Sequence, residues 1–148
     1  MLRHKGITLI ELMLALAILA VVAAIAMPSY TRYRDKVNVA RAIADIDTIS
    51  QALERYWAVN GSYPGSLADI KMQLTDPWGN PYYYTNIASA RGAGGLRKDK
   101  NLVPINSDFD LYSAGKDGAT VAPLTARASH DDIIRANNGA FIGLAEDY

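Results

Sequence analysis

The chain has 148 residues, with 15 basic and 15 acidic side chains, and half of its residues are apolar. This length accommodates one compact domain plus a membrane anchor and excludes two large domains. The balanced charge argues against nucleic acid as the main partner, and the absence of cysteine excludes disulfide bonds, thiol catalysis and zinc–thiolate sites.

The chain begins with a short basic leader and a long apolar segment. Residues 1–6 are rich in basic side chains and end at Gly6. Residues 7–28 are mostly apolar and, as a helix, are about long enough to cross a bilayer. Glu11 is the only charged residue of this segment. Because a carboxylate in contact with lipid is costly, its position predicts that a partner neutralises it.

The junction between leader and apolar segment, residues 5–12, reads KGITLIEL. It resembles the class III signal of type IV prepilins and type II secretion pseudopilins, in which the small residue lies before the apolar segment, whereas an ordinary secretory signal has it after. In that family a membrane aspartyl peptidase, the prepilin peptidase, cuts after the glycine and methylates the new amino terminus. The resemblance implies cleavage after Gly6, N-methylation of Ile7 and a role in assembly for Glu11.

Cleavage after Gly6 creates an ammonium group four residues before Glu11. Where lipid or packed protein excludes water, this amine can neutralise the carboxylate. The geometry is imperfect within one helix, so we expect Glu11 of a subunit already in a filament to meet the amine of the next subunit, which would set the axial register. The alternative is an uncleaved anchor whose Glu11 reaches the membrane interface.

A single long helix is predicted to follow the leader. Pro28 can bend this helix without ending it, because apolar residues resume a few positions later, and we count Pro28 with Glu11 among the assembly residues. Beyond Pro28 an apolar face recurs at helical spacing, formed by Ala42, Ile46, Ile49, Leu53 and Tyr56. Asn60-Gly61 predicts the end of the helix.

The rest of the chain predicts a small head. Residues 66–74 predict a short helical turn, and the turn at residues 76–81 leads into a strand at residues 82–84 with Tyr82 and Tyr84 on one face. The glycine-rich residues 91–100 predict a hairpin loop before a second strand at residues 108–113. We expect two or three antiparallel strands.

The C-terminal part has little periodicity over residues 115–138, whereas Phe141, Ile142 and Leu144 are apolar and are expected to pack back onto the core. The predicted fold class is therefore α+β, with a long N-terminal helical spike packed on a small antiparallel β-sheet head and an irregular C-terminal loop. We expect a leader at residues 1–6, a membrane and filament-core helix at residues 7–28, and an exported domain at residues 29–148, which includes the amphipathic half of the helix to about residue 60.

A glycine-bearing turn contains Asp117, and Asp131 and Asp132 follow downstream. Calcium takes six to eight oxygen ligands, and such a turn can present several carbonyl groups. The alternative is structural: Asp117 forms a tight turn, and the two downstream acids cap a helical turn that begins at Ile133. Spacing alone favours the structural alternative.

Residues 76–82, DPWGNPY, and residues 110–118, DLYSAGKDG, resemble the globular signature of the type II secretion major pseudopilin, whose C-terminal loop binds calcium. The resemblance implies calcium ligands at Asp117, at the Ala114 carbonyl and at Asp131 or Asp132, and it favours calcium over the structural alternative. Between Gly118 and Asp131 this chain is longer than the family's loop.

No feature indicates an enzyme. Trp78 and the tyrosines could form a stacking platform for a ligand, but aromatic side chains beside a turn and on a strand more often form core. His130 is the one histidine outside the leader, and neither a catalytic triad nor a zinc site has a supporting motif.

The resemblance implies a structural subunit of a helical type IV pilus-like filament, most specifically the major pseudopilin of a type II secretion system. Its implied partners are copies of itself, the prepilin peptidase, the assembly platform and minor pseudopilins. It would be a single-pass protein of the bacterial inner membrane with its head in the periplasm, and after assembly part of a periplasmic or extracellular filament. A subunit of a true type IV pilus and a single-copy membrane-anchored binding domain are the alternatives.

Overall fold

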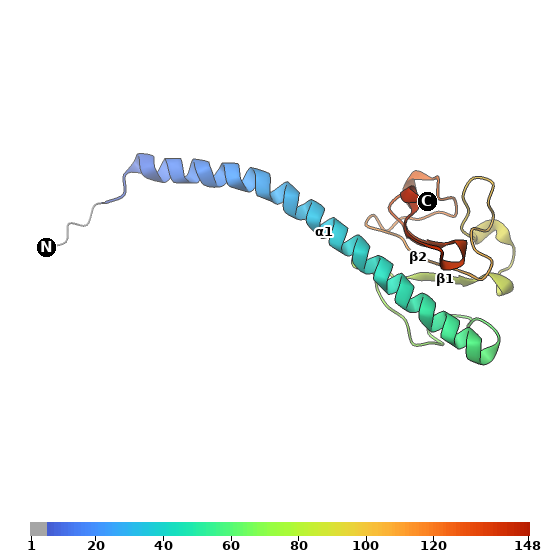
Figure 1. Cartoon of the computed structure of the whole chain (residues 1–148). Coiled ribbons are helices and arrows are strands. Elements are labelled where there is room, and N and C mark those ends of the chain that lie inside the picture. Colours follow the sequence, from blue (N-terminus) through green and yellow to red (C-terminus); the bar gives the residue numbers. More distant parts are fainter. Residues whose placement is uncertain (1–5) are drawn as a thin grey trace. The chain divides into compact units, whose positions relative to one another are not determined.

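The computed structural model describes residues 6–148 (Figure 1), so the basic leader residues 1–5 lie outside the described residues. The chain divides into two compact units, one ending at Val37 and the other comprising Asn38–Tyr148. The helix α1 (Leu9–Asn60) contributes to both units. Four strands follow it: β1 (Tyr83–Asn86), β2 (Phe109–Ser113), β3 (Ile133–Ala136) and β4 (Phe141–Leu144).

The helix α1 is continuous over 52 residues with Pro28 inside it, which confirms the prediction of one long helix. Pro28 has no N–H to donate to the preceding turn. Two nearby hydroxyl groups bond back to carbonyls of the preceding turn: Ser29 donates to the Ile25 carbonyl at 3.2 Å and Thr31 to the Met27 carbonyl at 2.9 Å. Asn60 and then Gly61, with φ of 72°, end the helix as predicted.

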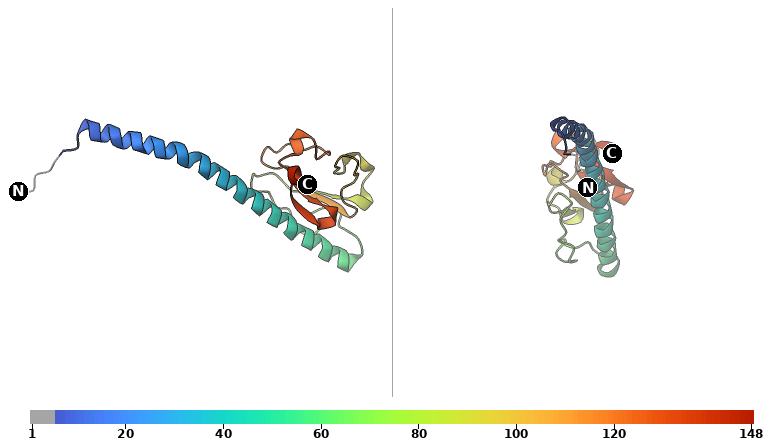
Figure 2. Two further views of the ribbon diagram at one scale, coloured as in Figure 1. Left: turned by 45° about the horizontal axis from the view of Figure 1, so that its top comes forward. Right: turned by 90° about the vertical axis from the view of Figure 1, so that its left-hand side faces the viewer.

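The core of the second unit lies between the C-terminal half of α1 and the sheet (Figure 2). Its helix side is the predicted apolar face, and its sheet side comes from β2 and β3; the fully buried members are Ala42, Ile46, Ile49, Leu53, Phe109, Leu111 and Ile133. Among the described residues, every buried one lies at Ala42 or later, so the second unit has its own core.

The sheet is an antiparallel meander in the order β1-β2-β3-β4. The predicted antiparallel pairing of the first two strands is confirmed. The connection between them runs over residues 87–108, so it is longer than the predicted loop at residues 91–100. Tyr82 and Tyr84 both pack against the core, as expected for residues two apart, whereas Tyr83 lies on the opposite face and stacks on Tyr112 at 5.2 Å between ring centroids.

The expectation of a helical turn at residues 66–74 is wrong. The segment forms overlapping hydrogen-bonded turns without helix, in which the Met72 amide donates to the Leu67 carbonyl at 3.0 Å. Lys71 has φ of 56°, a left-handed conformation that a helix cannot contain. The repeat of apolar residues reflects burial of Leu67 beneath the turn and not a helix.

The expected irregular tail also contains strands, so the count of two or three strands is wrong, and no helical turn begins at Ile133. Residues 133–136 form β3 because the segment is buried on both faces: Ile133 packs in the helix-side core, whereas Ile134 packs in a second cluster. A turn at Asn137–Gly139 with positive φ values then returns the chain into β4. Phe141, Ile142 and Leu144 pack on the two clusters, as predicted.

Candidate functional site

Gly6, Ile7 and Thr8 precede α1 and are not helical. All three are exposed, and no described atom lies within 4 Å of a Cβ placed on Gly6. A protease can therefore reach the bond after Gly6 without unwinding the helix. The charged side chains of the leader lie outside the described residues.

The first turn of α1 is capped by a reciprocal pair. The Thr8 amide and hydroxyl donate to Glu11 Oε2 at 2.9 and 2.8 Å, and the Glu11 amide donates to Thr8 Oγ1 at 3.3 Å. This is a capping box, in which the acid satisfies a helix N–H that would otherwise lack a partner. Glu11 is exposed in the single chain, so its carboxylate remains accessible to a cation.

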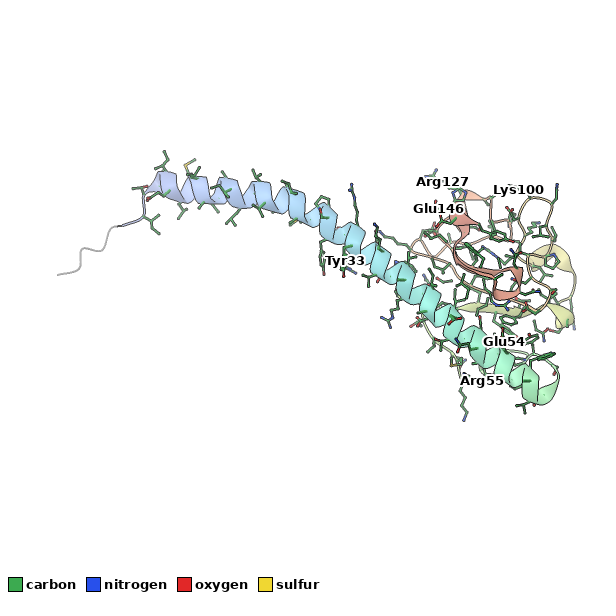
Figure 3. All side chains as sticks on the ribbon, viewed as in Figure 1. Tyr33, Glu54, Arg55, Lys100, Arg127 and Glu146 are labelled. Carbon is green, nitrogen blue, oxygen red and sulfur yellow. The ribbon has the colours of Figure 1, made fainter. Side chains whose placement is uncertain are left out.

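Beyond this cap the helix presents an apolar surface with nothing packed on it (Figure 3). The large apolar side chains there are more than half exposed, for example Leu9 at 79%, Ile18 at 57% and Met27 at 70%. Among the described residues, α1 alone is long and apolar enough to cross a membrane. Exposed apolar area of this extent indicates a surface that lipid or other protein covers.

In the head, the two sequence signatures meet at the end of β2. The carboxylate of the buried Asp76 accepts the amides of Trp78 and Asn80 at 3.0 and 2.8 Å through Oδ1, and the Ser113 hydroxyl at 2.5 Å through Oδ2. The Asn80 amide side chain donates to the Gly115 carbonyl at 3.2 Å. Residues 76–82 therefore fix the start of the turn that contains Asp117.

We predict that Asp76→Ala destabilises the head by about 2 to 4 kcal/mol, because the Ser113 hydroxyl and two amides lose a buried acceptor. Urea unfolding followed by tryptophan fluorescence measures this loss. Asp69→Ala is the matched control, since exposed Asp69 caps a turn through one bond, from the Ser66 amide at 2.9 Å. Equal effects of the two substitutions would contradict the role of Asp76.

The structure places the backbone of Asp117 beside Asp131, another of the expected calcium ligands. The Asp117 amide donates to Asp131 Oδ2 at 3.0 Å, and a Cβ on Gly115 would lie 2.2 Å from the Asp131 carbonyl oxygen, so the two chain segments are in close contact. Asp117 Oδ1 also accepts the Ala119 amide at 2.7 Å, the tight-turn geometry of the structural alternative. Ala114, whose carbonyl is the third expected ligand, is buried.

Asp132 has a different environment from Asp131. Its side chain is buried, and its Oδ2 forms an ion pair with Arg97 and accepts the Thr120 hydroxyl at 2.7 Å. Burial raises the pKa of the Asp132 carboxyl, although the bonds from Thr120 and Arg97 oppose this. Within residues 6–148, no group of three or more His, Cys, Asp or Glu side chains is arranged to hold a metal ion.

Sequence reasoning missed two buried arginines. Arg135 donates to both carboxylate oxygens of Asp108, at 2.9 and 2.7 Å, and its guanidinium lies 3.9 Å from the centre of the Phe109 ring. Arg97 pairs with Asp132 and lies 4.3 Å from the centre of the Tyr112 ring. A signal for Arg135 exists, because it interrupts the apolar residues 133–136, but nothing local in the sequence marks Arg97.

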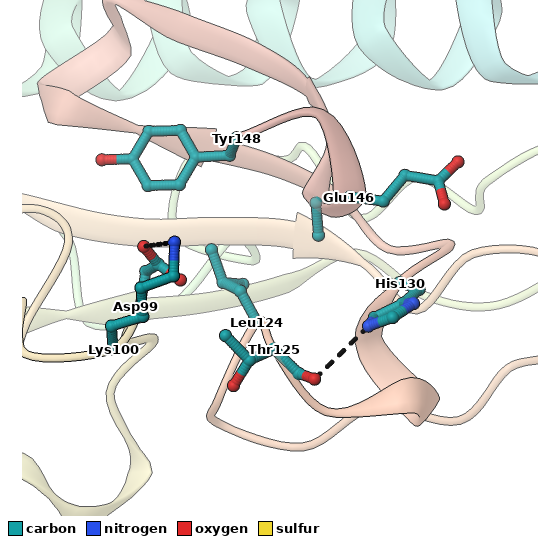
Figure 4. Close-up of a pocket in the computed structure, with 8 residues that line it drawn as sticks. Asp99, Lys100, Leu124, Thr125, His130, Glu146 and Tyr148 are labelled. Atoms are coloured by element: carbon teal, nitrogen blue, oxygen red, sulfur yellow. Dashed lines mark hydrogen bonds and ion pairs between the residues drawn. The ribbon is translucent and has the colours of Figure 1, made fainter.

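A pocket of about 390 Å³ opens near the C-terminus, beside His130 (Figure 4). The His130 ring nitrogen Nε2 lies 3.3 Å from the Thr125 carbonyl oxygen, and the Lys100 ammonium lies 3.9 Å from Asp99 Oδ2. The His130 ring is therefore held against a backbone carbonyl of the same loop.

Residues 1–27 match the family described as the prokaryotic N-terminal methylation motif. The type II secretion system core protein G of Pseudomonas aeruginosa is 30% identical over 138 residues, covering 78% of this chain and 86% of that protein. The protein of the same name from Pectobacterium carotovorum is 32% identical, with 88% and 83% covered.

A fimbrial protein of Neisseria meningitidis is 39% identical over 63 residues, which is 43% of this chain and 37% of that protein. No solved structure matches the chain significantly.

Proposed function

The chain belongs to the family of type II secretion system core protein G, the major pseudopilins, and from this premise we propose how it works. It is a structural subunit of a pseudopilin filament, anchored in the inner membrane by the N-terminal part of α1. The prepilin peptidase cuts after Gly6 and methylates Ile7. An assembly platform with minor pseudopilins then extracts the subunits and polymerises them, and filament growth pushes proteins outward.

The exposed apolar surface with one acid near its end carries this proposal. In the membrane, lipid covers the apolar side chains of α1, and in the filament the helices of neighbouring subunits cover them. Before assembly, the Thr8 cap holds the Glu11 carboxylate. Cleavage supplies an ammonium group that a single chain does not need for capping, so this group is available to the Glu11 of a neighbouring subunit.

Electron microscopy of material sheared from cells that overproduce the protein tests filament formation. We expect filaments that contain this chain, with the head of each subunit on the exported side. A single-copy membrane-anchored binding domain would yield no filaments at any expression level, which would refute the proposed function.

A subunit of a true type IV pilus is the second candidate, favoured by the similarity to the fimbrial protein over 63 residues. Deletion of the gene separates the two. Loss of secreted enzymes from the medium with normal surface motility supports the secretion filament, whereas loss of motility with normal secretion supports the pilus.

We further propose that the turn at Asp117 binds calcium through Asp117, Asp131 and the Ala114 carbonyl. The contact between Asp117 and Asp131 supports this choice of acid, since Arg97 already neutralises Asp132. Calcium at about a hundred times its Kd would stabilise the head by about 2.7 kcal/mol.

We therefore expect EGTA to lower the Tm of the full chain in detergent by about 10 °C. Asp117→Ala should remove this response. An identical Tm with calcium and with EGTA in the wild-type protein would end the calcium proposal and leave the proposed filament function standing.

A further inference from the structure

Arg97 lies in the long connection between β1 and β2, and its side chain is buried, with 2% of the residue exposed. Its guanidinium meets three oxygen atoms of the connection between β2 and β3. One nitrogen, Nη2, pairs with Asp132 Oδ2, and the other, Nη1, donates to Thr120 Oγ1 at 2.7 Å and to the Val121 carbonyl at 2.6 Å. A carboxylate, a hydroxyl and a carbonyl oxygen are the donor types that a hard cation takes in a protein.

These three oxygens are fixed by further bonds. The Thr120 hydroxyl donates to Asp132 Oδ2 at 2.7 Å, and the Ser129 hydroxyl donates to the Val121 carbonyl at 2.8 Å. Thr120, Val121 and Ser129 all lie in a segment without strands or α-helix, which therefore depends on such contacts for its conformation.

Arg97 is also fixed by contacts with the sheet. Its amide donates to Oδ2 of the buried Asp110 at 2.7 Å, and its guanidinium lies over the Tyr112 ring of β2. The next residue, Lys98, exchanges backbone bonds with the same C-terminal segment, from its amide to the Ala122 carbonyl at 3.1 Å and from the Leu124 amide to its carbonyl at 2.9 Å.

We propose that Arg97 is a built-in cation that fastens the β2–β3 connection to the sheet, so that closure of this loop at Asp132 requires no metal ion. The guanidinium occupies the place beside Asp132 that a bound cation would take, and it neutralises a carboxylate that has no access to water. A planar fork can bond to several oxygens at once, which an ammonium group cannot do in the same fixed geometry. The inference does not depend on filament formation.

The test is thermal unfolding of the full chain in detergent, followed by near-ultraviolet circular dichroism, with calcium and with EGTA. Arg97→Met removes the charge and keeps a side chain of similar length. We expect it to lower the Tm by about 10 to 20 °C, and equally with calcium and with EGTA. Arg97→Lys keeps the charge without the fork and should lose about half as much. Arg127→Met, which changes an exposed arginine of the same loop, should stay within about 2 °C of the wild type.

A double-mutant cycle with Asp132→Asn isolates the contribution of the pair. If Arg97→Met alone does not accumulate, the Tm of the double variant is compared with that of Asp132→Asn alone, which it should match or exceed. We expect the double variant to lose much less Tm than the sum of the losses of the two single variants. The reason is that removing both partners leaves no unpaired buried charge. The proposal is overturned if Arg97→Met melts like the wild type, if the two losses are additive, or if the loss from Arg97→Met appears in EGTA and vanishes in calcium.

Discussion

Replacing Glu11 with glutamine is expected to abolish filaments while leaving membrane insertion and cleavage intact. Glutamine can still accept the Thr8 amide and hydroxyl, since Glu and Gln both serve in a capping box, so the start of α1 is preserved. What is lost is the charge that meets the amine of the neighbouring subunit. We expect at least a tenfold drop in sheared filament mass by immunoblot, with the mature form still present in the membrane.

Two further variants, one at Glu11 and one at Thr8, separate the role of the charge from the role of the cap. Glu11→Leu, which removes both, should also give processed, inserted and unassembled protein. Thr8→Val removes the hydroxyl contacts and keeps the carboxylate, so it should retain filaments. If Glu11→Gln assembled normally and Thr8→Val did not, the acid would be only a helix cap, and the proposed register pair would be refuted.

Replacing Gly6 with valine should block maturation. No described atom lies within 4 Å of a Cβ at this position, so the substitution leaves the fold undisturbed and acts on the peptidase alone. Because the proposed cut follows a glycine, we expect about tenfold less mature protein or lower. Intact-mass measurement of the membrane fraction should find the precursor with all six leader residues.

The control for the Gly6 variant is the stability of the head, because every buried residue among those described lies at Ala42 or later. The Tm of the precursor should therefore match that of the wild type. A valine variant that is cut as fast as the wild type would place the processing site elsewhere.

The elements that could be predicted from sequence are those with strong local patterns. The apolar face from Ala42 to Leu53 specifies the helix by its period, and the aromatic run at residues 82–84 with the turn before it specifies the first hairpin. The missed strands lack such a pattern. Ile133 and Ile134 are buried on opposite faces, so no alternation marks β3, and the Asn137–Gly139 turn was the one local signal for a hairpin.

Among the candidate site residues, too, those within a short local motif could be predicted, whereas those paired through tertiary packing could not. Gly6, Ile7 and Glu11 lie close together in the chain, so a short motif is enough to predict a role for each. The pairing of Arg97 with Asp132 joins residues 35 apart through tertiary packing, and no local feature of the sequence predicts this pairing. Thr120 and Val121, the other two partners of Arg97, lie between Gly118 and Asp131, in the segment that the sequence comparison with the family pattern predicts to be long.

The most direct test of the account is the mass of the polypeptide in filaments sheared from the native host. The account predicts a single species that begins at Ile7 and has one methyl group on its amino terminus. A chain that retains residues 1–6, recovered only as separate membrane-bound copies, would contradict it.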